Sequence, residues 1–209
     1  MNMGSGAGGV RCYNSHRAIN SLLSPRLLVC DALNMRRMLI LSAILGVCGI
    51  QIAAAQPQSG CALPDGLSPV IARKYLNAHV VRMSDLNLDD QKLFQKEHGS
   101  SCPGLTRVDF YGDGKPTLAL VLLRTNGAKD AQLVVAHQVE DQWETLLVDT
   151  ADASPVPVVW NEKPGKYYDV YGQKTLDANR PAVVFCGYES WAILYAWTGK
   201  EVEKIWISD

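Results

Sequence analysis

The sequence predicts an α+β domain in which mostly antiparallel β-meander sheets follow one or two short N-terminal helices. Two observations predict this fold class. From Leu105 onward, short apolar runs are separated by turn-forming residues, which is typical of strands and hairpins. Ahead of that residue, two segments carry helix start signals, so the helices are expected in the N-terminal part of the domain.

The first 55 residues are expected to lie outside the folded domain. Residues 35–55 have the pattern of a cleavable secretory signal, because a basic start is followed by an apolar run over 39–52 and then by three alanines. The run is short and rich in glycine for a membrane span, and an uncleaved N-terminal anchor is the alternative interpretation. Residues 1–34 are interpreted as a misassigned start or a leader. The mature protein is therefore expected to begin near Gln56 and to be secreted or periplasmic.

The mature chain is expected to form one domain, with residues 56–104 as its N-terminal loop and helices and residues 105–209 as its β-meander part. Removing 55 of the 209 residues leaves 154, enough for a single core. Five of the 20 Lys and Arg residues and one of the 21 Asp and Glu residues are removed, so 15 positive and 20 negative side chains remain, a net charge of −5. This unclustered acidic composition argues against nucleic acid and against anionic membrane as partners.

Two helices are expected ahead of the strands. Ser68 and Pro69 form a start signal, since serine accepts hydrogen bonds from free helix amides and proline suits the first turn, and they predict a helix over about 69–77. Asn87 forms a second start signal, with Asp90 three residues later, and predicts a helix that ends before Gly99.

Nine apolar runs predict the strands, and the short, turn-prone spacers between several of them predict antiparallel pairing of neighbours. The runs are Leu105–Tyr111, Thr117–Arg124, Ala131–Val139, Trp143–Asp149, Val156–Trp160, Tyr167–Tyr171, Ala182–Tyr188, Trp191–Trp197 and Val202–Ile207. Residues 118–123 are apolar at six successive positions, so we expect this strand to be covered on both faces, with the N-terminal helices on the second face.

Three cysteines remain after signal cleavage, and an oxidising compartment predicts one disulfide among them. We favour Cys61 with Cys102, because both lie in loop segments rich in Gly, Pro and Ser. Cys186 lies in the apolar run 183–185 and is expected to be a buried small side chain.

One loop resembles a metal-binding motif. Residues 109–119 read DFYGDGKPTLA, and they are similar to the FG-GAP or VCBS-type repeat of β-propeller proteins, a strand-loop-strand element whose carboxylates hold calcium. The resemblance implies that Asp109 and Asp113 are metal ligands and that Gly114 permits the turn, whereas Tyr111 and Thr117 depart from the pattern. A hairpin whose two aspartates cap the turn is the alternative. A single copy implies the local geometry and not a propeller.

Aromatic residues gather in the last third of the chain. They are expected either to fill a thin β core or to form an exposed ligand surface, for which Tyr188, Trp191 and Trp197 are the candidates.

Catalytic motifs are scarce in the mature sequence. His79, His98 and His137 have no metal-binding spacing, and Ser190 lacks the glycines of a nucleophile elbow. Nucleotide-binding glycine patterns are also missing, so no cofactor is predicted beyond calcium at the loop. The leading hypothesis is a non-catalytic module that binds an exported or envelope protein or a small ligand. The alternatives are a hydrolase using the carboxylates Asp109 with Asp113 or Glu189 with Asp169, and a calcium-stabilised structural module.

Overall fold

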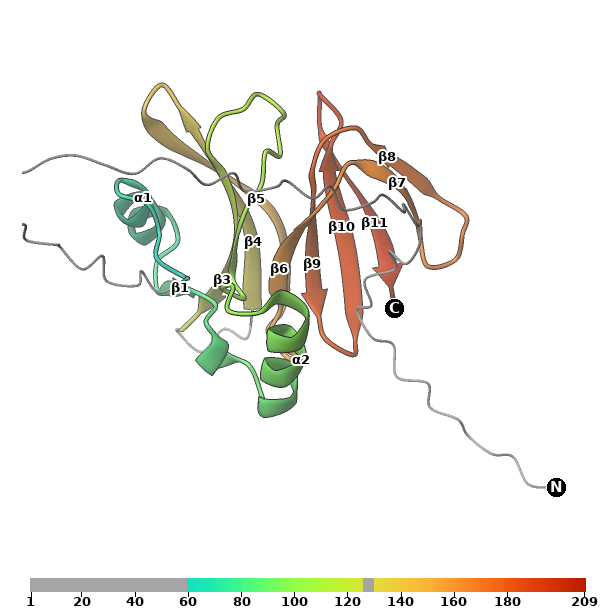
Figure 1. The fold of residues 1–209 in the computed structure, drawn as a ribbon. Helices are drawn as coiled ribbons and strands as arrows, with labels where there is room; N and C mark the ends of the chain where they lie inside the picture. Colours follow the sequence, from blue (N-terminus) through green and yellow to red (C-terminus); the bar gives the residue numbers. More distant parts are fainter. Residues whose placement is uncertain (1–59, 126–129) are drawn as a thin grey trace, which may run out of the picture. The chain divides into compact units, whose positions relative to one another are not determined.

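The α+β fold class is confirmed by the structure, a computed structural model that describes residues 60–125 and 130–209. These residues form two short helices and mostly antiparallel sheets (Figure 1). The predicted leader, 1–34, and the predicted signal peptide, 35–55, lie outside the described residues. Neither helix of the described part has the length and apolar composition that a membrane crossing needs.

Both predicted helices are present, and one start signal was wrong. Helix α1 (Leu67–Lys74) follows Gly66, which has φ of 82° and provides no side-chain cap, so Ser68 lies within the first turn instead of capping it. Helix α2 (Leu88–His98) begins as predicted, since the Asn87 side chain accepts hydrogen bonds from the N–H groups of Asp89 and Asp90. Between the helices lie strand β1 (Ala78–Val80) and the short 3-10 helix η1 (Met83–Asp85).

The first sheet has the order β1-β3-β4-β5, with β2 paired to the same strand β3. Its further strands are β2 (Leu105–Arg107), β3 (Thr117–Arg124), β4 (Asp130–Val139) and β5 (Gln142–Asp152). Strand β2 is shorter than predicted because the chain leaves β3 after Val108 to form the loop that contains Asp109.

The second sheet has the order β11-β10-β9-β6, and a separate hairpin pairs β7 with β8. The strands are β6 (Val158–Glu162), β7 (Gly165–Tyr168), β8 (Thr175–Ala178), β9 (Ala182–Gly187), β10 (Trp191–Trp197) and β11 (Val202–Ser208). Every pair is antiparallel, as the short spacers predicted.

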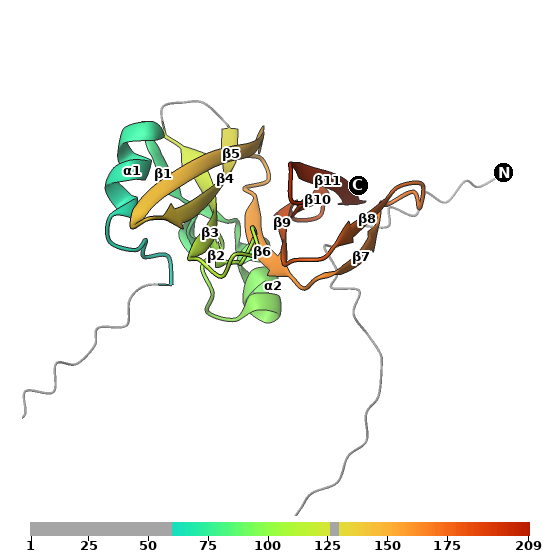
Figure 2. The same ribbon diagram turned by 90° about the horizontal axis from the view of Figure 1, so that it is seen from above.

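Strand β3 is buried on both faces, as its continuous apolar run predicted, whereas β5 at the edge of the same sheet is largely exposed. Leu118, Leu120 and Leu122 of β3 pack with Leu67 and Ile71 of α1, so α1 covers one face. The alternate residues of β3 pack into a second core with β9 and β10, and α2 also contributes to that core instead of covering the outer face. The layers therefore run from α1 through the first and second sheets to the β7–β8 hairpin (Figures 1 and 2).

The predicted disulfide is confirmed. Cys61 and Cys102 are bonded, with their Cα atoms 5.0 Å apart, and the bond ties the segment ahead of α1 to the segment ahead of β2. Cys186 is fully buried in β9, as its apolar surroundings predicted.

Candidate functional site

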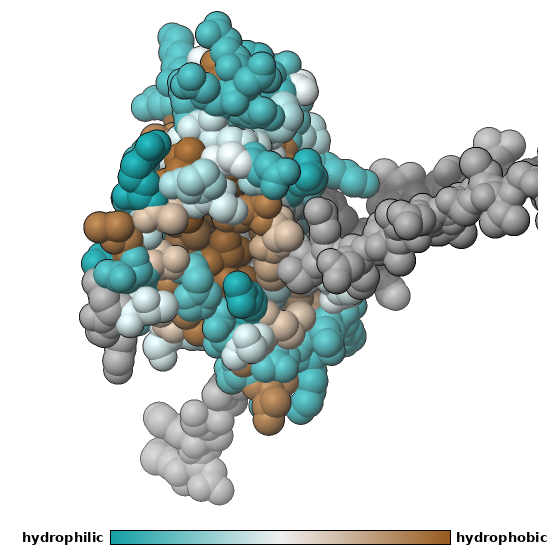
Figure 3. Space-filling model, turned by 90° about the vertical axis from the view of Figure 1, so that its left-hand side faces the viewer, coloured by the Kyte–Doolittle hydropathy of each residue, from teal (hydrophilic) through white to brown (hydrophobic). Residues whose placement is uncertain are grey.

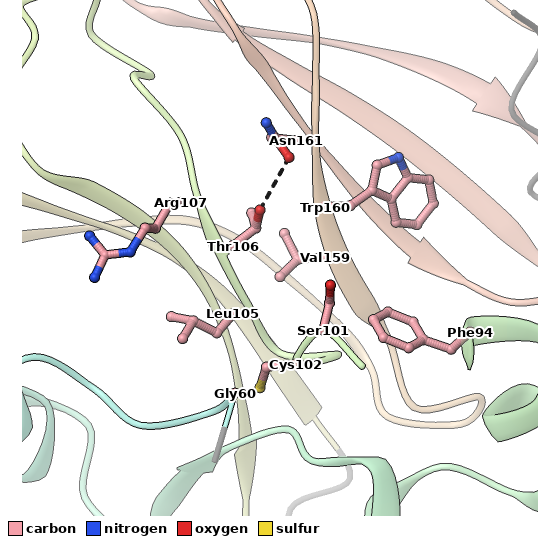
Figure 4. A pocket seen from close by; sticks show the side chains of 10 residues that line it. All are labelled: Gly60, Phe94, Ser101, Cys102, Leu105, Thr106, Arg107, Val159, Trp160 and Asn161. Atoms are coloured by element: carbon pink, nitrogen blue, oxygen red, sulfur yellow. Dashed lines mark hydrogen bonds between the residues drawn. The ribbon is translucent and has the colours of Figure 1, made fainter. Parts of the chain in front are cut away.

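The two sheets meet at a seam where strand β2 adjoins strand β6. The main-chain N–H of Val159 donates a hydrogen bond to the C=O of Pro103 at 2.8 Å, which joins the sheets at one end of the seam. Farther along, the hydroxyl of Thr106 donates to the side-chain oxygen of Asn161 at 3.4 Å (Figure 4). Side chains from both sheets therefore border one surface channel.

A groove follows this seam, and we call it the seam groove. It consists of two adjoining depressions of about 310 and about 410 Å³ that share Arg107 and Asn161. The first depression, the aromatic end, is lined by Phe94, Ser101, Leu105, Thr106, Val159 and Trp160 among others. The second, the polar end, is lined by Val108, Asp109, Gly114, Lys115, Pro116, Thr117 and Pro181. In Figure 4, Phe94 and Trp160 lie on one side of the aromatic end, and Arg107 points away from them.

The aromatic end is held rigid by a ring stack behind it. His98 lies between Phe94 and Trp160, with ring centroids 4.8 and 5.0 Å apart. Burial lowers the pKa of His98, which favours a neutral ring in this apolar position. The indole N–H of Trp160 donates to Glu162 at 3.0 Å and fixes the second ring. A rigid apolar wall of this kind is preformed for an apolar side chain of a ligand.

The polar end is bordered by the loop that resembles the calcium-binding repeat. The carboxylate of Asp109 accepts a hydrogen bond from the N–H of Gly114 at 3.3 Å, and that of Asp113 accepts from the N–H of Lys115 at 3.1 Å. Gly112 and Gly114 have φ of 69° and 72°, values that favour glycine. Both aspartates therefore cap this turn, which is the alternative that the sequence left open.

The second oxygen of Asp113 contacts a residue that the sequence did not indicate. Asp113 Oδ2 lies 3.0 Å from Nε2 of His137 in β4, and the ring of His137 stacks on Tyr111 at 4.6 Å. Tyr111 in turn meets the edge of Trp197 at 5.2 Å. Burial raises the pKa of Tyr111, and the charges of Glu144 and Asp113 add to this. The loop at the polar end is thus anchored to both sheets.

Calcium binding at this loop remains a prediction. Within residues 60–125 and 130–209, no three or more His, Cys, Asp or Glu side chains converge as a metal site would require. Asp109 and Asp113 would have to release the contacts described above, or add further oxygen ligands, to hold the ion.

The aromatic surface expected at Tyr188, Trp191 and Trp197 is not a shared exposed face. Tyr188 is only 2% exposed, because it lies beneath α2 near Glu97. Burial raises its pKa, and the charges of Glu97 and Asp90 act in the same direction. Trp191 packs edge-on against Phe185 at 5.0 Å, and Trp197 against Tyr111.

Glu189 and Asp169 belong to different local structures. Asp169 caps the β7–β8 turn by accepting from the N–H groups of residues 173 and 174. Glu189 lines a depression of about 270 Å³ with Asp89 and Asp90. Burial raises the pKa of Asp90, and the nearby charge of Glu189 raises it further.

A separate apolar surface lies on the side of the molecule that carries α1 and β5. Figure 3 shows apolar residues gathered in the middle of this side, between hydrophilic regions. Leu63, Val70 and Trp143 are partly buried against the core beneath α1, and Leu147 is 46% exposed. The seam groove combines a defined shape with both apolar and polar lining residues, so we take it as the candidate site.

Of the seam groove, only the loop at the polar end, which contains Asp109 and Gly114, was indicated by the sequence. Arg107 and Asn161 belong to different sheets and meet only in the folded chain, and neither belongs to a recognisable motif. Comparisons with protein-family models, with curated proteins and with solved structures found nothing that this chain matches.

Proposed function

We propose that this chain is an exported, non-catalytic interaction module that binds an extended segment of another exported or envelope protein in the seam groove. The observation that carries the proposal is the form of the groove: two depressions joined at Arg107 and Asn161, one walled by aromatic rings and the other by a capped turn. Such a channel suits a peptide whose successive side chains enter separate subsites.

The lining favours binding over catalysis. Among the described side chains that border the groove, Asp109 is the one carboxylate and none is a histidine. Asp109 is thus the one candidate base, and its carboxylate already caps the turn by accepting from the N–H of Gly114, so the hydroxyls of Ser101, Thr106 and Thr117 have no histidine to activate them. What the groove offers is shape, apolar surface and hydrogen-bonding groups.

Export is supported by the Cys61–Cys102 disulfide, since such bonds persist in oxidising compartments. The signal-like segment at 35–55 supports the same conclusion. The partner is then expected among proteins of the same compartment.

The test is a display library of random dodecapeptides, panned on the exported protein. We expect enriched peptides to bind wild type and to lose binding to Asn161→Trp, because the bulky ring would fill the junction of the two depressions. The matched control is Gln173→Trp, which puts the same ring on the exposed β7–β8 turn. A library that yields no peptide sensitive to Asn161→Trp would refute the proposal.

A second candidate is the carboxylate-dependent hydrolase, and one observation favours it. Asp90 and Glu189 share a depression, and the pKa of Asp90 is raised by burial and by Glu189, as an acid partner would need. An assay with chromogenic glycosides and esters tests it. Hydrolysis that disappears in Asp90→Asn and survives Asp177→Asn would support the enzyme; no turnover of any substrate in the panel would remove this candidate.

A further inference from the structure

We infer that the segment bound by the seam groove is acidic, with a carboxylate at the polar end and an apolar side chain at the aromatic end. This inference rests on the proposed function and adds the chemistry of the ligand. It follows from the charges around the polar end, from the absence of ion pairs to these cations among the described residues, and from the apolar wall at the other end.

Three cations surround the polar end. Arg107 and Lys115 are exposed and line it directly. Arg180 lies over the same loop, since its Cδ and Nε atoms come within 2.6 Å of the position a Cβ would occupy on Gly112. Gly112 therefore provides the space in which Arg180 packs, and a larger residue there would displace the arginine.

None of these cations is held in an ion pair in the described part of the chain, although the charge of Lys115 acts on the neighbouring Asp113. By contrast, Lys92, Arg124 and Lys204 each pair with an aspartate. Asp109 is the one acid lining this end, and its carboxylate already accepts the N–H of Gly114. Three cations against the two carboxylates of Asp109 and Asp113 leave the polar end with a net charge of +1 on a mature chain of net charge −5, so it would attract an anionic group that the rest of the surface repels.

Arginine and lysine suit a carboxylate of a peptide ligand. The guanidinium of Arg107 can donate two parallel hydrogen bonds to one carboxylate, and the Lys115 ammonium adds a point charge. At the aromatic end, the partly buried Leu105 and Trp160 offer apolar surface to an aliphatic or aromatic side chain, whereas Phe94 is buried. A peptide with both features would occupy the whole groove.

The experiment uses the peptides enriched by the panning described above, resynthesised as pairs in which each Asp or Glu is changed to Asn or Gln. We expect the acidic member of each pair to bind wild type at least ten-fold more tightly, with the difference shrinking at high salt. Arg107→Glu should abolish this preference and favour a Lys-containing peptide instead. Lys200→Glu, the same charge change in the exposed β10–β11 turn, should leave the preference intact.

The outcomes separate the two proposals. One outcome is that peptides lose binding to Asn161→Trp while their acidic and amide forms bind wild type equally well. That result would overturn the acidic ligand and leave the binding module standing. A reversed preference in Arg107→Glu would support both. The absence of any peptide dependent on the groove would overturn both.

Discussion

The carboxylate of Asp149 in β5 lies 2.6 Å from the ammonium of Lys204 in β11, and this contact joins the two sheets. The hydroxyl of Tyr195 in β10 donates to the same carboxylate oxygen at 2.5 Å. Burial alone would raise the pKa of Asp149, but the hydrogen bonds from Lys204, Tyr195 and the N–H of Thr150 outweigh it and hold the pKa below its usual value.

Asp149→Asn is expected to destabilise the fold by about 1 kcal/mol at pH 7, below the roughly 1.5–3 kcal/mol of a hydrogen bond to a charged group, because solvent screens this partly exposed pair. Because the folded-state pKa lies below the unfolded value of about 4, the carboxylate stabilises the protein above that pH. Its contribution is lost as the pH falls through the folded-state pKa. The free energies of unfolding of wild type and variant, measured with urea, should therefore converge at acidic pH. Asp177→Asn, at an exposed position of β8, is the control, and an equal effect of both variants would count against this account.

Glu97→Gln is expected to stabilise the protein at neutral pH by up to about 0.5 kcal/mol. Burial raises the pKa of Glu97, and the charge of Lys96 and the nearby hydroxyl of Tyr188 only partly oppose it. A raised folded-state pKa means that the charged form costs stability above that pKa, and that this cost vanishes below about pH 4. Denaturant midpoints at pH 7 and pH 3.5 measure the difference. The exposed Glu201→Gln serves as control, and a gain that persists at pH 3.5 would contradict the explanation.

Loss of the disulfide should lower the free energy of unfolding more than either of these carboxylate substitutions. The bond between Cys61 and Cys102 closes a loop with a sequence separation of 41, so the double variant Cys61→Ala/Cys102→Ala is expected to lose about 2–4 kcal/mol. Urea unfolding measures the loss, with Ser100→Ala as a neighbouring control. An unchanged midpoint would show that other contacts already restrain the N-terminal segment.

Millimolar calcium is expected to leave the melting temperature unchanged. Calcium prefers six to eight oxygen ligands, whereas Asp113 already contacts His137 and caps the turn, and Asp109 also accepts from the turn. Thermal unfolding with and without calcium measures this directly. A rise in the midpoint that Asp109→Asn removes would instead support the calcium-stabilised module, since an ion that binds only the folded state must stabilise it.

The sequence predicted the parts of the fold that depend on local pattern. The continuous apolar run of β3 required cover on both faces, and α1 provides it on one of them. The Asn87 cap and the Cys61–Cys102 pair were also predicted correctly. Strands β1 and β8 were not predicted, because they are only three and four residues long. In β8, the buried Leu176 and Ala178 also alternate with polar residues.

The candidate site could not be predicted in the same way. Arg107 and Asn161 lie on strands of different sheets, and nothing in the sequence near either residue records that those strands adjoin. The aromatic candidates failed for a related reason: a tyrosine in a strand looks the same in sequence whether its strand end faces solvent or, like Tyr188, lies under a helix. Pairing across sheets has no periodic signature.

Gly60 is one of the residues that line the aromatic end of the seam groove, next to the disulfide. Under the proposed function, a tag joined ahead of this residue would begin beside the groove, so a tag after Asp209 is the better choice for binding measurements.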